Sequence, residues 1–190
     1  MDSMEKPDAQ AKAIPVYRHS AEYAIQHGEI EAYRDSFKAN MDCRDAIEKA
    51  IGENYRDNRL DTKTTSVQLG QKFGMERVSY VLANTIRCKD HDGRISDGNK
   101  RWAATVPVAE DRSEWGENRN LRFIVDRTNP GLVDLIVNQV RKDLAVEKEA
   151  GEKKPSEAGE KKPSVLEKLQ KSRAAISGAE SPKKHKEAVL

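Results

Sequence analysis

The chain has 190 residues, of which 36% are hydrophobic and 35% charged, so it can form one domain with an appendage or at most two small domains. Two cysteines, Cys43 and Cys88, are too few and too far apart for a disulfide framework or a zinc site. No apolar run approaches the roughly 20 residues of a membrane-spanning helix, and residues 1–13 lack the apolar stretch of a signal peptide, so we expect a cytoplasmic protein.

Positive charge is concentrated near the C-terminus. Residues 147–190 contain eleven Lys or Arg and eight Asp or Glu, a net charge of +3, whereas residues 1–146 contain 23 basic and 24 acidic residues. Generic nucleic-acid binding usually shows as a basic surplus on the domain that binds. The nearly neutral residues 1–146 therefore favour a protein partner over bare duplex DNA.

Apolar periodicity predicts helices in the first half of the chain, after a flexible leader over residues 1–14. Ser20 is a suitable N-cap for a short helix that Gly28 ends. A longer helix follows, and a third begins at the capping residues of 61–65 and ends near Gly74. The apolar stripe of the long helix consists of Ile30, Tyr33, Phe37, Met41, Ile47, Ile51 and Tyr55.

The second half continues this helical pattern. Residues 75–87 have a strong apolar face, and Ser96 or Asp97 can cap a further short helix that Pro107 ends. Residues 108–120 are expected to form an exposed loop around Trp115. Asn as N-cap and Pro at the first helical position predict a last helix from residues 129–130 to about Val146.

One segment favours a strand. Residues 121–125 are rich in β-forming residues, and residues 105–108 are the nearest partner, confined to an edge by Pro107. The sequence thus predicts a mainly α (α+β) fold, with a single compact helical domain over 15–146 and at most one small two-stranded β element. A disordered Lys/Glu-rich tail over 147–190 is expected to follow, in which Ser164 and Glu167 form a capping box for a short helix over 164–176.

The residues around His91 are the nearest approach to a catalytic or metal site. A calcium loop starting at Asp90 would have Arg94 at its fifth position and Arg101 at its twelfth, where oxygen ligands are needed. His91 between two aspartates lacks further ligands or an orienting partner. Cys88 lies between Arg87 and Lys89, a setting that can lower a thiol pKa, but a lone cysteine in a helix is more often a packing residue. We expect no enzymatic activity, no cofactor and no metal.

A denser candidate is the segment 87–102, because Arg and Trp are favoured binding anchors. Two interpretations remain open: a partner-binding surface, or a charged loop with Trp102 turned into the core. The candidate partner-binding residues are Arg87, Lys89, Asp90, His91, Asp92, Arg94, Asn99, Lys100, Arg101 and Trp102.

Several motifs in order resemble a domain family of uncharacterised function that is common on bacterial conjugative and other mobile elements. They are Tyr17–Ala24, Glu31–Ser36, Asn54–Asn58, Tyr80–Thr85, Asp90–Arg94 and Thr128–Leu132. The resemblance covers roughly residues 15–146. Within that family, the length and motif order are similar to an anti-CRISPR inhibitor of the single-chain RNA-guided nuclease of type II systems.

This resemblance implies a protein that acts by stoichiometric binding to the type II nuclease, alone or with guide and DNA, and prevents target cleavage. It implies no catalytic residues. The alternative is a DNA-binding accessory protein of a mobile element that uses the segment 87–102 and the lysine-rich tail. A third hypothesis is a metal-dependent nuclease built on His91 and the neighbouring aspartates.

Overall fold

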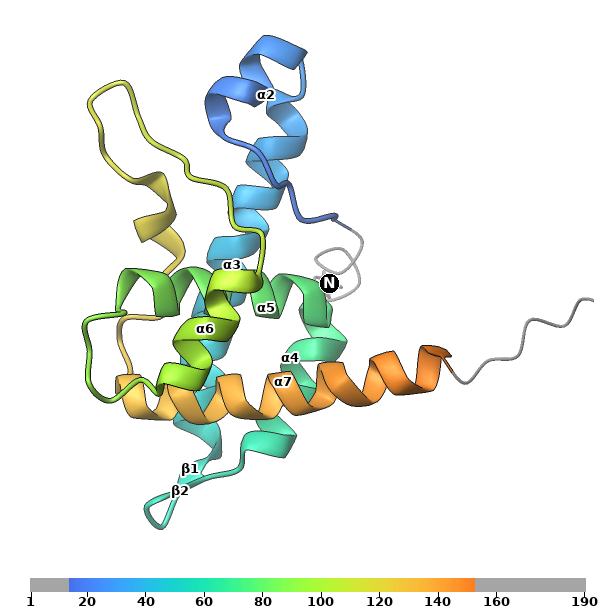
Figure 1. Cartoon of the computed structure of the whole chain (residues 1–190), viewed down its shortest axis with the longest axis vertical. Helices are drawn as coiled ribbons and strands as arrows, with labels where there is room; N and C mark the ends of the chain where they lie inside the picture. The colour runs from blue at the N-terminus through green and yellow to red at the C-terminus, as the bar shows by residue number, and fades with distance from the viewer. Residues whose placement is uncertain (1–13, 153–190) are drawn as a thin grey trace, which may run out of the picture. The chain divides into compact units, whose positions relative to one another are not determined.

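The computed structural model describes residues 14–152, which form six α-helices, one 3-10 helix and one two-stranded sheet (Figure 1). The mainly helical fold class is confirmed. Residues 1–13 of the expected leader over 1–14 lie outside the described residues, as do residues 153–190 of the expected tail over 147–190, with its helix over 164–176. Residues 147–152 of that expected tail belong to the last helix. The elements are α2 (Ala21–His27), α3 (Ile30–Asn54), β1 (Tyr55–Arg56), β2 (Arg59–Leu60), α4 (Thr62–Phe73), α5 (Met75–Cys88), α6 (Asp97–Thr105), η1 (Arg119–Phe123) and α7 (Pro130–Glu152).

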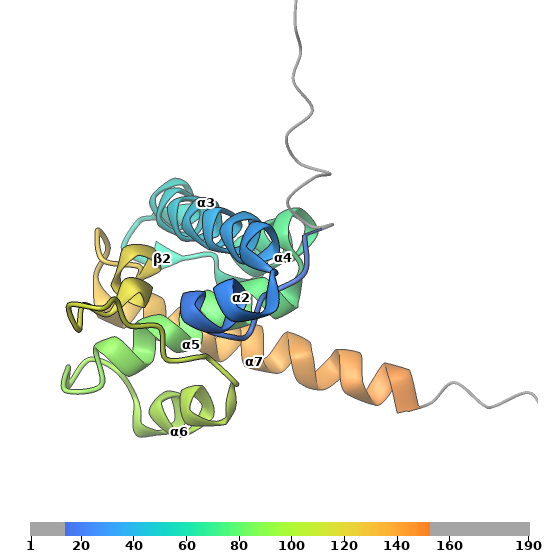
Figure 2. The ribbon, with the colours of Figure 1, turned by 90° about the horizontal axis from the view of Figure 1, so that it is seen from above.

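Helix α5 lies at the centre of the core, and every residue from 77 to 86 is buried. Helices α3, α4, α6 and α7 and the 3-10 helix all pack against it. In Figure 2, α5 lies between α3 on one side and α6 on the other. Because α5 has neighbours on all sides, the polar residues within this stretch must find hydrogen-bond partners inside the protein.

Three predicted helix starts are confirmed by side-chain caps, whereas α6 begins at Asp97 as predicted but Ser96 forms no side-chain cap hydrogen bond. Ser20 Oγ accepts a hydrogen bond from the Tyr23 amide at 3.2 Å, and Asp61 Oδ1 accepts one from the Thr64 amide at 3.0 Å. Asn129 Oδ1 likewise accepts from the Gly131 amide at 2.8 Å. Gly28, which ends α2, has φ +70°, a left-handed conformation that favours glycine.

The predicted strand over 121–125 is wrong. Residues 119–123 form the 3-10 helix η1, and residues 105–108 are the end of α6 and the loop after it. Asn118 Oδ1 accepts from the Asn120 amide at 3.0 Å and starts η1, so a local side-chain contact overrides the β-propensity of the segment. Phe123 and Val125 are buried in the core instead.

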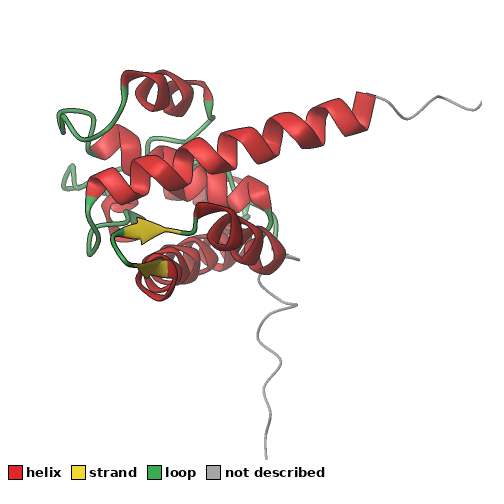
Figure 3. Ribbon diagram, turned by 90° about the horizontal axis from the view of Figure 1, so that it is seen from below, coloured by secondary structure: helices red, strands yellow, loops and turns green. Residues whose placement is uncertain are grey.

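The actual sheet is a hairpin of β1 and β2, drawn yellow in Figure 3. Tyr55 pairs with Leu60 and Arg56 with Arg59. The two residues between the strands, Asp57 and Asn58, have φ +50° and +59°. Positive φ at both central positions is typical of the two-residue turns that match the twist of a hairpin, and Asp and Asn are common there.

Helix α7 begins where predicted but ends at Glu152, six residues beyond the expected end near Val146. Its C-terminal part extends past the other helices of the domain (Figures 1 and 2). None of the helices within residues 14–152 combines the length and the apolar character needed to cross a bilayer.

Arg77 is the largest fully buried side chain, with 1% of its surface exposed. Its guanidinium donates to the Ser36 carbonyl at 3.0 Å, to Asn40 Oδ1, and to the carbonyls of Ile14 and Pro15 at 2.8 and 3.1 Å. Burial lowers the pKa of Arg77. Its hydrogen bonds join α5 to α3 and to the segment that precedes α2.

The loop over 108–120 is exposed at Trp115, as predicted, with 89% of that side chain accessible. Asp111 in the same loop is nevertheless buried. Its carboxylate accepts hydrogen bonds from the Ala21 amide at 3.2 Å, from Tyr33 Oη at 2.6 Å and from Arg119 Nη1 at 3.0 Å. One carboxylate therefore holds α2, α3 and the end of this loop together.

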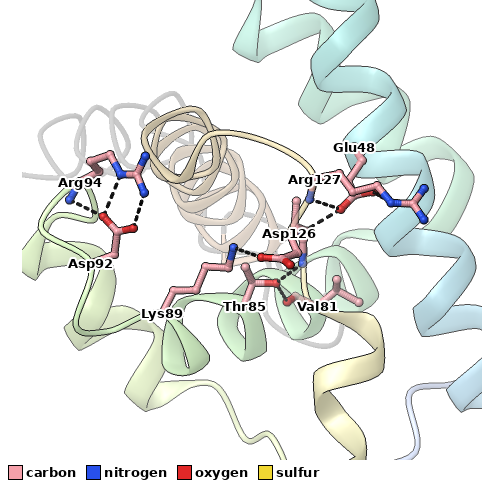
Figure 4. Close-up of polar contacts among 9 residues, drawn as sticks. Glu48, Val81, Thr85, Lys89, Asp92, Arg94, Asp126 and Arg127 are labelled. Carbon is pink, nitrogen blue, oxygen red and sulfur yellow. Dashed lines mark hydrogen bonds and ion pairs between the residues drawn. The ribbon is translucent and has the colours of Figure 1, made fainter.

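A second carboxylate fixes the segment between η1 and α7. Glu48 Oε1 on α3 accepts from the backbone amides of Asp126 and Arg127, each at 2.9 Å (Figure 4). Thr85 Oγ1 on α5 accepts from the Val125 amide at 3.0 Å. These contacts satisfy three consecutive amides that no regular element pairs.

We expect Arg77→Met to lower the free energy of unfolding by about 3 kcal/mol, because it leaves buried carbonyls without donors. Arg77→Lys should also be destabilising, since an ammonium lacks the planar fork that reaches several acceptors. Urea unfolding measures both. The control is Arg34→Met, which removes an exposed arginine paired with Glu31 and should change stability little. Equal losses for the variants at 77 and 34 would contradict the role of Arg77.

Burial and the hydrogen bond to Asp111 raise the pKa of Tyr33. The unfolded chain releases this proton near pH 10, so the associated stability is complete below pH 10 and is lost as the pH rises above it. Tyr33→Phe should therefore be less stable than the native chain at pH 8, by about 2 kcal/mol, and the gap should narrow between pH 10 and 11. Urea unfolding of the native chain and of Tyr33→Phe at pH 8 and at pH 11 tests this. A difference in the free energy of unfolding that widens at the higher pH would refute it.

Candidate functional site: a groove between α4, α6 and α7

An open groove of about 850 Å3 lies where α4, the C-terminal end of α6 and α7 meet. Its wall contains several apolar side chains, and Val67 on α4 is 47% exposed although it is large and hydrophobic. The apolar side chains that line the groove are Val67, Met75, Trp102, Val106 and Leu144. Concave apolar surfaces of this kind are the usual location of ligand and peptide sites.

Two glycines shape the floor of the groove at the junction of α4 and α5. Gly74 alone separates the two helices and has φ +78°, a conformation that favours glycine. A Cβ added to Gly70 would lie 2.6 Å from Met75 Sδ, so Gly70 allows the methionine to fold back onto α4. The floor therefore presents a flexible thioether, which adapts readily to the shape of a bound partner.

Trp102 on α6 closes one side of the groove. Its side chain is half-buried and packs against the core while it also lines the groove. Thr105 Oγ1 donates to the Trp102 carbonyl at 2.7 Å in the last turn of α6. Trp102 thus contributes both to the core and to the open surface, and it is the only sequence-predicted site residue that lines this groove.

Polar groups border the apolar wall. Asp143 on α7 accepts hydrogen bonds from Ser66 Oγ at 2.5 Å and from Gln139 Nε2 at 2.8 Å. On the opposite border, Arg18 and Glu76 form an ion pair at 2.7 Å. These side chains are held in place by their partners, so the groove has a fixed polar border around its apolar wall.

Arg87, one of the predicted binding residues, has a structural role. Its guanidinium donates to the carbonyls of Ala103 at 2.9 Å, Ala104 at 3.2 Å and Val106 at 2.6 Å. These carbonyls belong to the end of α6 or follow it, where backbone acceptors lack helical partners. Arg87 therefore fastens the end of α6 to α5 and indirectly supports the groove.

Lys89, Asp92 and Arg94 are also engaged within the domain (Figure 4). Lys89 Nζ lies 2.6 Å from Asp126 Oδ1, and this hydrogen bond lowers the pKa of Asp126. Arg94 Nε and Nη2 donate to the two oxygens of Asp92 at 3.0 and 2.7 Å. Hydrogen bonds from Arg94 hold the pKa of Asp92 well below its usual range.

The remaining predicted residues divide into buried and exposed groups. Asn99 is fully buried; it donates to Asp134 Oδ1 and accepts from Arg141 Nη1, each at 2.7 Å. Asp90, His91 and Arg101 are exposed, and Lys100 is half-buried. The segment 87–102 is thus mainly a structural connection, and the structure does not gather its ten predicted residues into one site.

The surroundings of Cys88 favour the interpretation of a packing residue over that of a reactive thiol. Burial raises the pKa of Cys88 and outweighs the neighbouring charges of Arg87 and Lys89, which act in the opposite direction. Within residues 14–152, no cluster of three or more His, Cys, Asp or Glu side chains is placed to hold a metal ion.

The groove itself was not predicted. Its residues come from four separate segments, near residues 18, 66–79, 102–107 and 143–148, which only the packing of helices brings together. The Gly70 and Gly74 pair, four residues apart at a helix end, was the local sequence signal of a close approach.

No curated protein and no solved structure matches the sequence. A family model described as a protein of unknown function, DUF3849, matches residues 16–145, close to the extent expected from the motifs. Because this match covers more than half of the 190 residues, the chain belongs to the DUF3849 family.

Proposed function

We propose that this domain binds a segment of a partner protein in the groove between α4, α6 and α7, and acts by occupying that partner. The observation that carries the proposal is the partly exposed apolar wall formed by Val67, Met75 and Trp102 within a fixed polar border. An apolar wall with a polar border is the usual composition of a protein interface. Tryptophan is also among the residues that most often dominate binding energy.

The occupant we propose is an amphipathic helix of the partner. Helices α4 and α7 form two sides of the groove, and α7 extends beyond the domain, so a third helix can lie along it (Figure 1). Such helices bind with apolar residues at three- and four-residue spacing. Glu147 and Lys148, exposed near the end of α7, offer one charge of each sign to orient that helix.

The partner we propose is the RNA-guided nuclease of type II CRISPR systems, with inhibition of target cleavage as the result. The support is the resemblance of the ordered motifs to an inhibitor of that nuclease. Such nucleases need a conformational change before they cut, and a ligand that binds one state of a moving element can prevent this change. Residues 14–152 contain 24 acidic and 22 basic residues, so this charge balance does not favour mimicry of DNA.

A DNA-binding accessory protein of a mobile element is the second candidate. Arg87, Lys89 and Arg94 already have partners within the domain, which weakens the case for DNA contact through the segment 87–102. The observation that favours DNA contact lies elsewhere, in Arg56 and Arg59 of the β1–β2 hairpin, which have no side-chain partner in the part of the chain that the structure describes.

The test combines a pull-down with a cleavage titration. The nuclease should retain the full chain in the pull-down, with or without guide and target DNA, and cleavage should fall in proportion to the chain added. Absence of both effects at micromolar protein would exclude the nuclease as partner.

Val67→Glu tests the groove. A carboxylate placed in an apolar interface is buried without a partner, so we expect the affinity for the nuclease to fall by about tenfold or more. The matched control is Leu135→Glu, since Leu135 is 46% exposed, close to the 47% of Val67, but lies outside the groove. Thermal unfolding checks that both variants fold. Equal binding by both variants would remove the groove from the proposal while leaving inhibition itself intact.

A further inference from the structure

The tip of the β1–β2 hairpin carries a pair of arginines with an unusual placement. Register sets Arg56 directly opposite Arg59 in the antiparallel ladder. Side chains opposite each other in such a ladder have Cβ atoms about 4.5–5.5 Å apart and project from the same face. Like charges at this spacing destabilise a hairpin, and a two-stranded hairpin is only marginally stable by itself. Nothing in the packing of this hairpin calls for two positive charges.

Neither arginine is neutralised by the part of the chain that the structure describes. Both side chains are exposed, and neither forms an ion pair or a side-chain hydrogen bond with residues 14–152. Together with Glu53, Asn54, Leu60 and Asp61 they line a hollow of about 520 Å3 at the end of α3. The two guanidinium groups are therefore available to a ligand from solution.

The carboxylates that line this hollow are already engaged. Asp61 caps α4, accepting from the Thr64 amide at 3.0 Å and from Thr64 Oγ1 at 2.7 Å. Hydrogen bonds from Thr64 lower the pKa of Asp61. Glu53 lies 3.8 Å from Lys49 Nζ in an ion pair one turn away on α3. Asp57, at the turn itself, has no such partner within residues 14–152, and its charge weakens the positive potential of the two arginines.

We propose that Arg56 and Arg59 form a phosphate-binding pair that contacts the backbone of a nucleic acid. Guanidinium groups match the geometry of phosphate oxygens. They are also more weakly hydrated than an ammonium group, so they lose less hydration energy when they bind a phosphate. The major groove of DNA admits a two-stranded β-ribbon, and a narrow hairpin with a two-residue turn has that form. Residues 147–190 of the same chain, with eleven basic and eight acidic residues and a net charge of +3, add a modest sequence-independent attraction to phosphates.

This site is separate from the groove. None of the residues that line the groove belongs to the hairpin. The two surfaces lie on different elements, so each proposal can fail without the other. A nuclease inhibitor could hold a protein segment in the groove while the hairpin contacts nucleic acid bound to the same partner.

The experiment measures binding of the full chain to a fluorescent 20-base-pair duplex by anisotropy between about 50 and 200 mM salt. Arg56→Gln/Arg59→Gln should weaken duplex binding several-fold. It should also reduce the slope of the logarithm of the binding constant against the logarithm of the salt concentration by about 1 to 2, because fewer counterions are released when fewer phosphates are contacted. Asp57→Asn should strengthen binding. Asn also tolerates positive φ, so the turn conformation is kept.

The matched control is Arg122→Gln/Lys142→Gln. It removes the same charge from two exposed basic residues in η1 and α7 that form no side-chain hydrogen bond or ion pair within residues 14–152. Equal losses of affinity and slope in the two double variants would overturn the proposal, since only net charge would then matter. Absence of duplex binding at low salt would overturn it as well. If poly-glutamate binds with the same dependence on Arg56 and Arg59 while the duplex does not, the pair recognises an acidic protein surface and the proposal is wrong.

Discussion

The fold depends on how a single positive charge is satisfied in its interior. Arg77 is buried in α5, and its two Nη atoms donate to backbone carbonyls, to the Ser36 hydroxyl and to one amide oxygen rather than to a carboxylate, while its Nε has no hydrogen-bond partner within residues 14–152. Removing a cation from water is costly unless its donors find acceptors. Those acceptors come from α3 and from Ile14 and Pro15, so the charge can be buried only when all three segments are assembled. The N-terminal segment is thereby tied to the central helix before any helix of its own begins.

Helix α5 also contributes to the groove, through its first residue, Met75. Since only Gly74 separates α4 from α5, Met75 must turn back over Gly70, and the end of α4 stays open beside α7. Arg87 at the other end of α5 holds the terminal carbonyls of α6 and so positions Trp102 across the groove. A helix that is buried from residue 77 to 86 thus positions two sides of the open surface.

The sequence was sufficient for the helices but not for the β element. Apolar spacing and caps such as Ser20, Asp61 and Asn129 are local signals, and local contacts form these helices. The segment 121–125 has strand-forming residues, yet Asn118 starts a 3-10 turn there and the core takes Phe123 and Val125. Each strand of the hairpin at 55–60 has only two residues, so the alternation of side chains that is typical of strands cannot be recognised in the sequence. The local sequence signal of the hairpin was the turn-forming pair Asp57-Asn58. The partners of Arg87 and Lys89 lie far along the chain, in the carbonyls at and after the end of α6 and in Asp126, and the sequence alone does not show them, whereas Arg94 pairs with Asp92 two residues away.

The charged residues fall into two groups. One group forms hydrogen bonds that hold the domain together, and the other has no side-chain partner within residues 14–152. Asp111, Glu48 and Arg87 each join elements that are far apart in sequence, and each is saturated by backbone or side-chain contacts. Arg56 and Arg59 instead remain exposed and unpaired within residues 14–152, on a hairpin that their mutual repulsion weakens. Such an arrangement is costly for the free protein, and in the proposed complex a bound phosphate offsets this cost. In the groove, the apolar side chains of Val67 and Trp102 are likewise partly exposed, and their contact with water is unfavourable until a partner covers them.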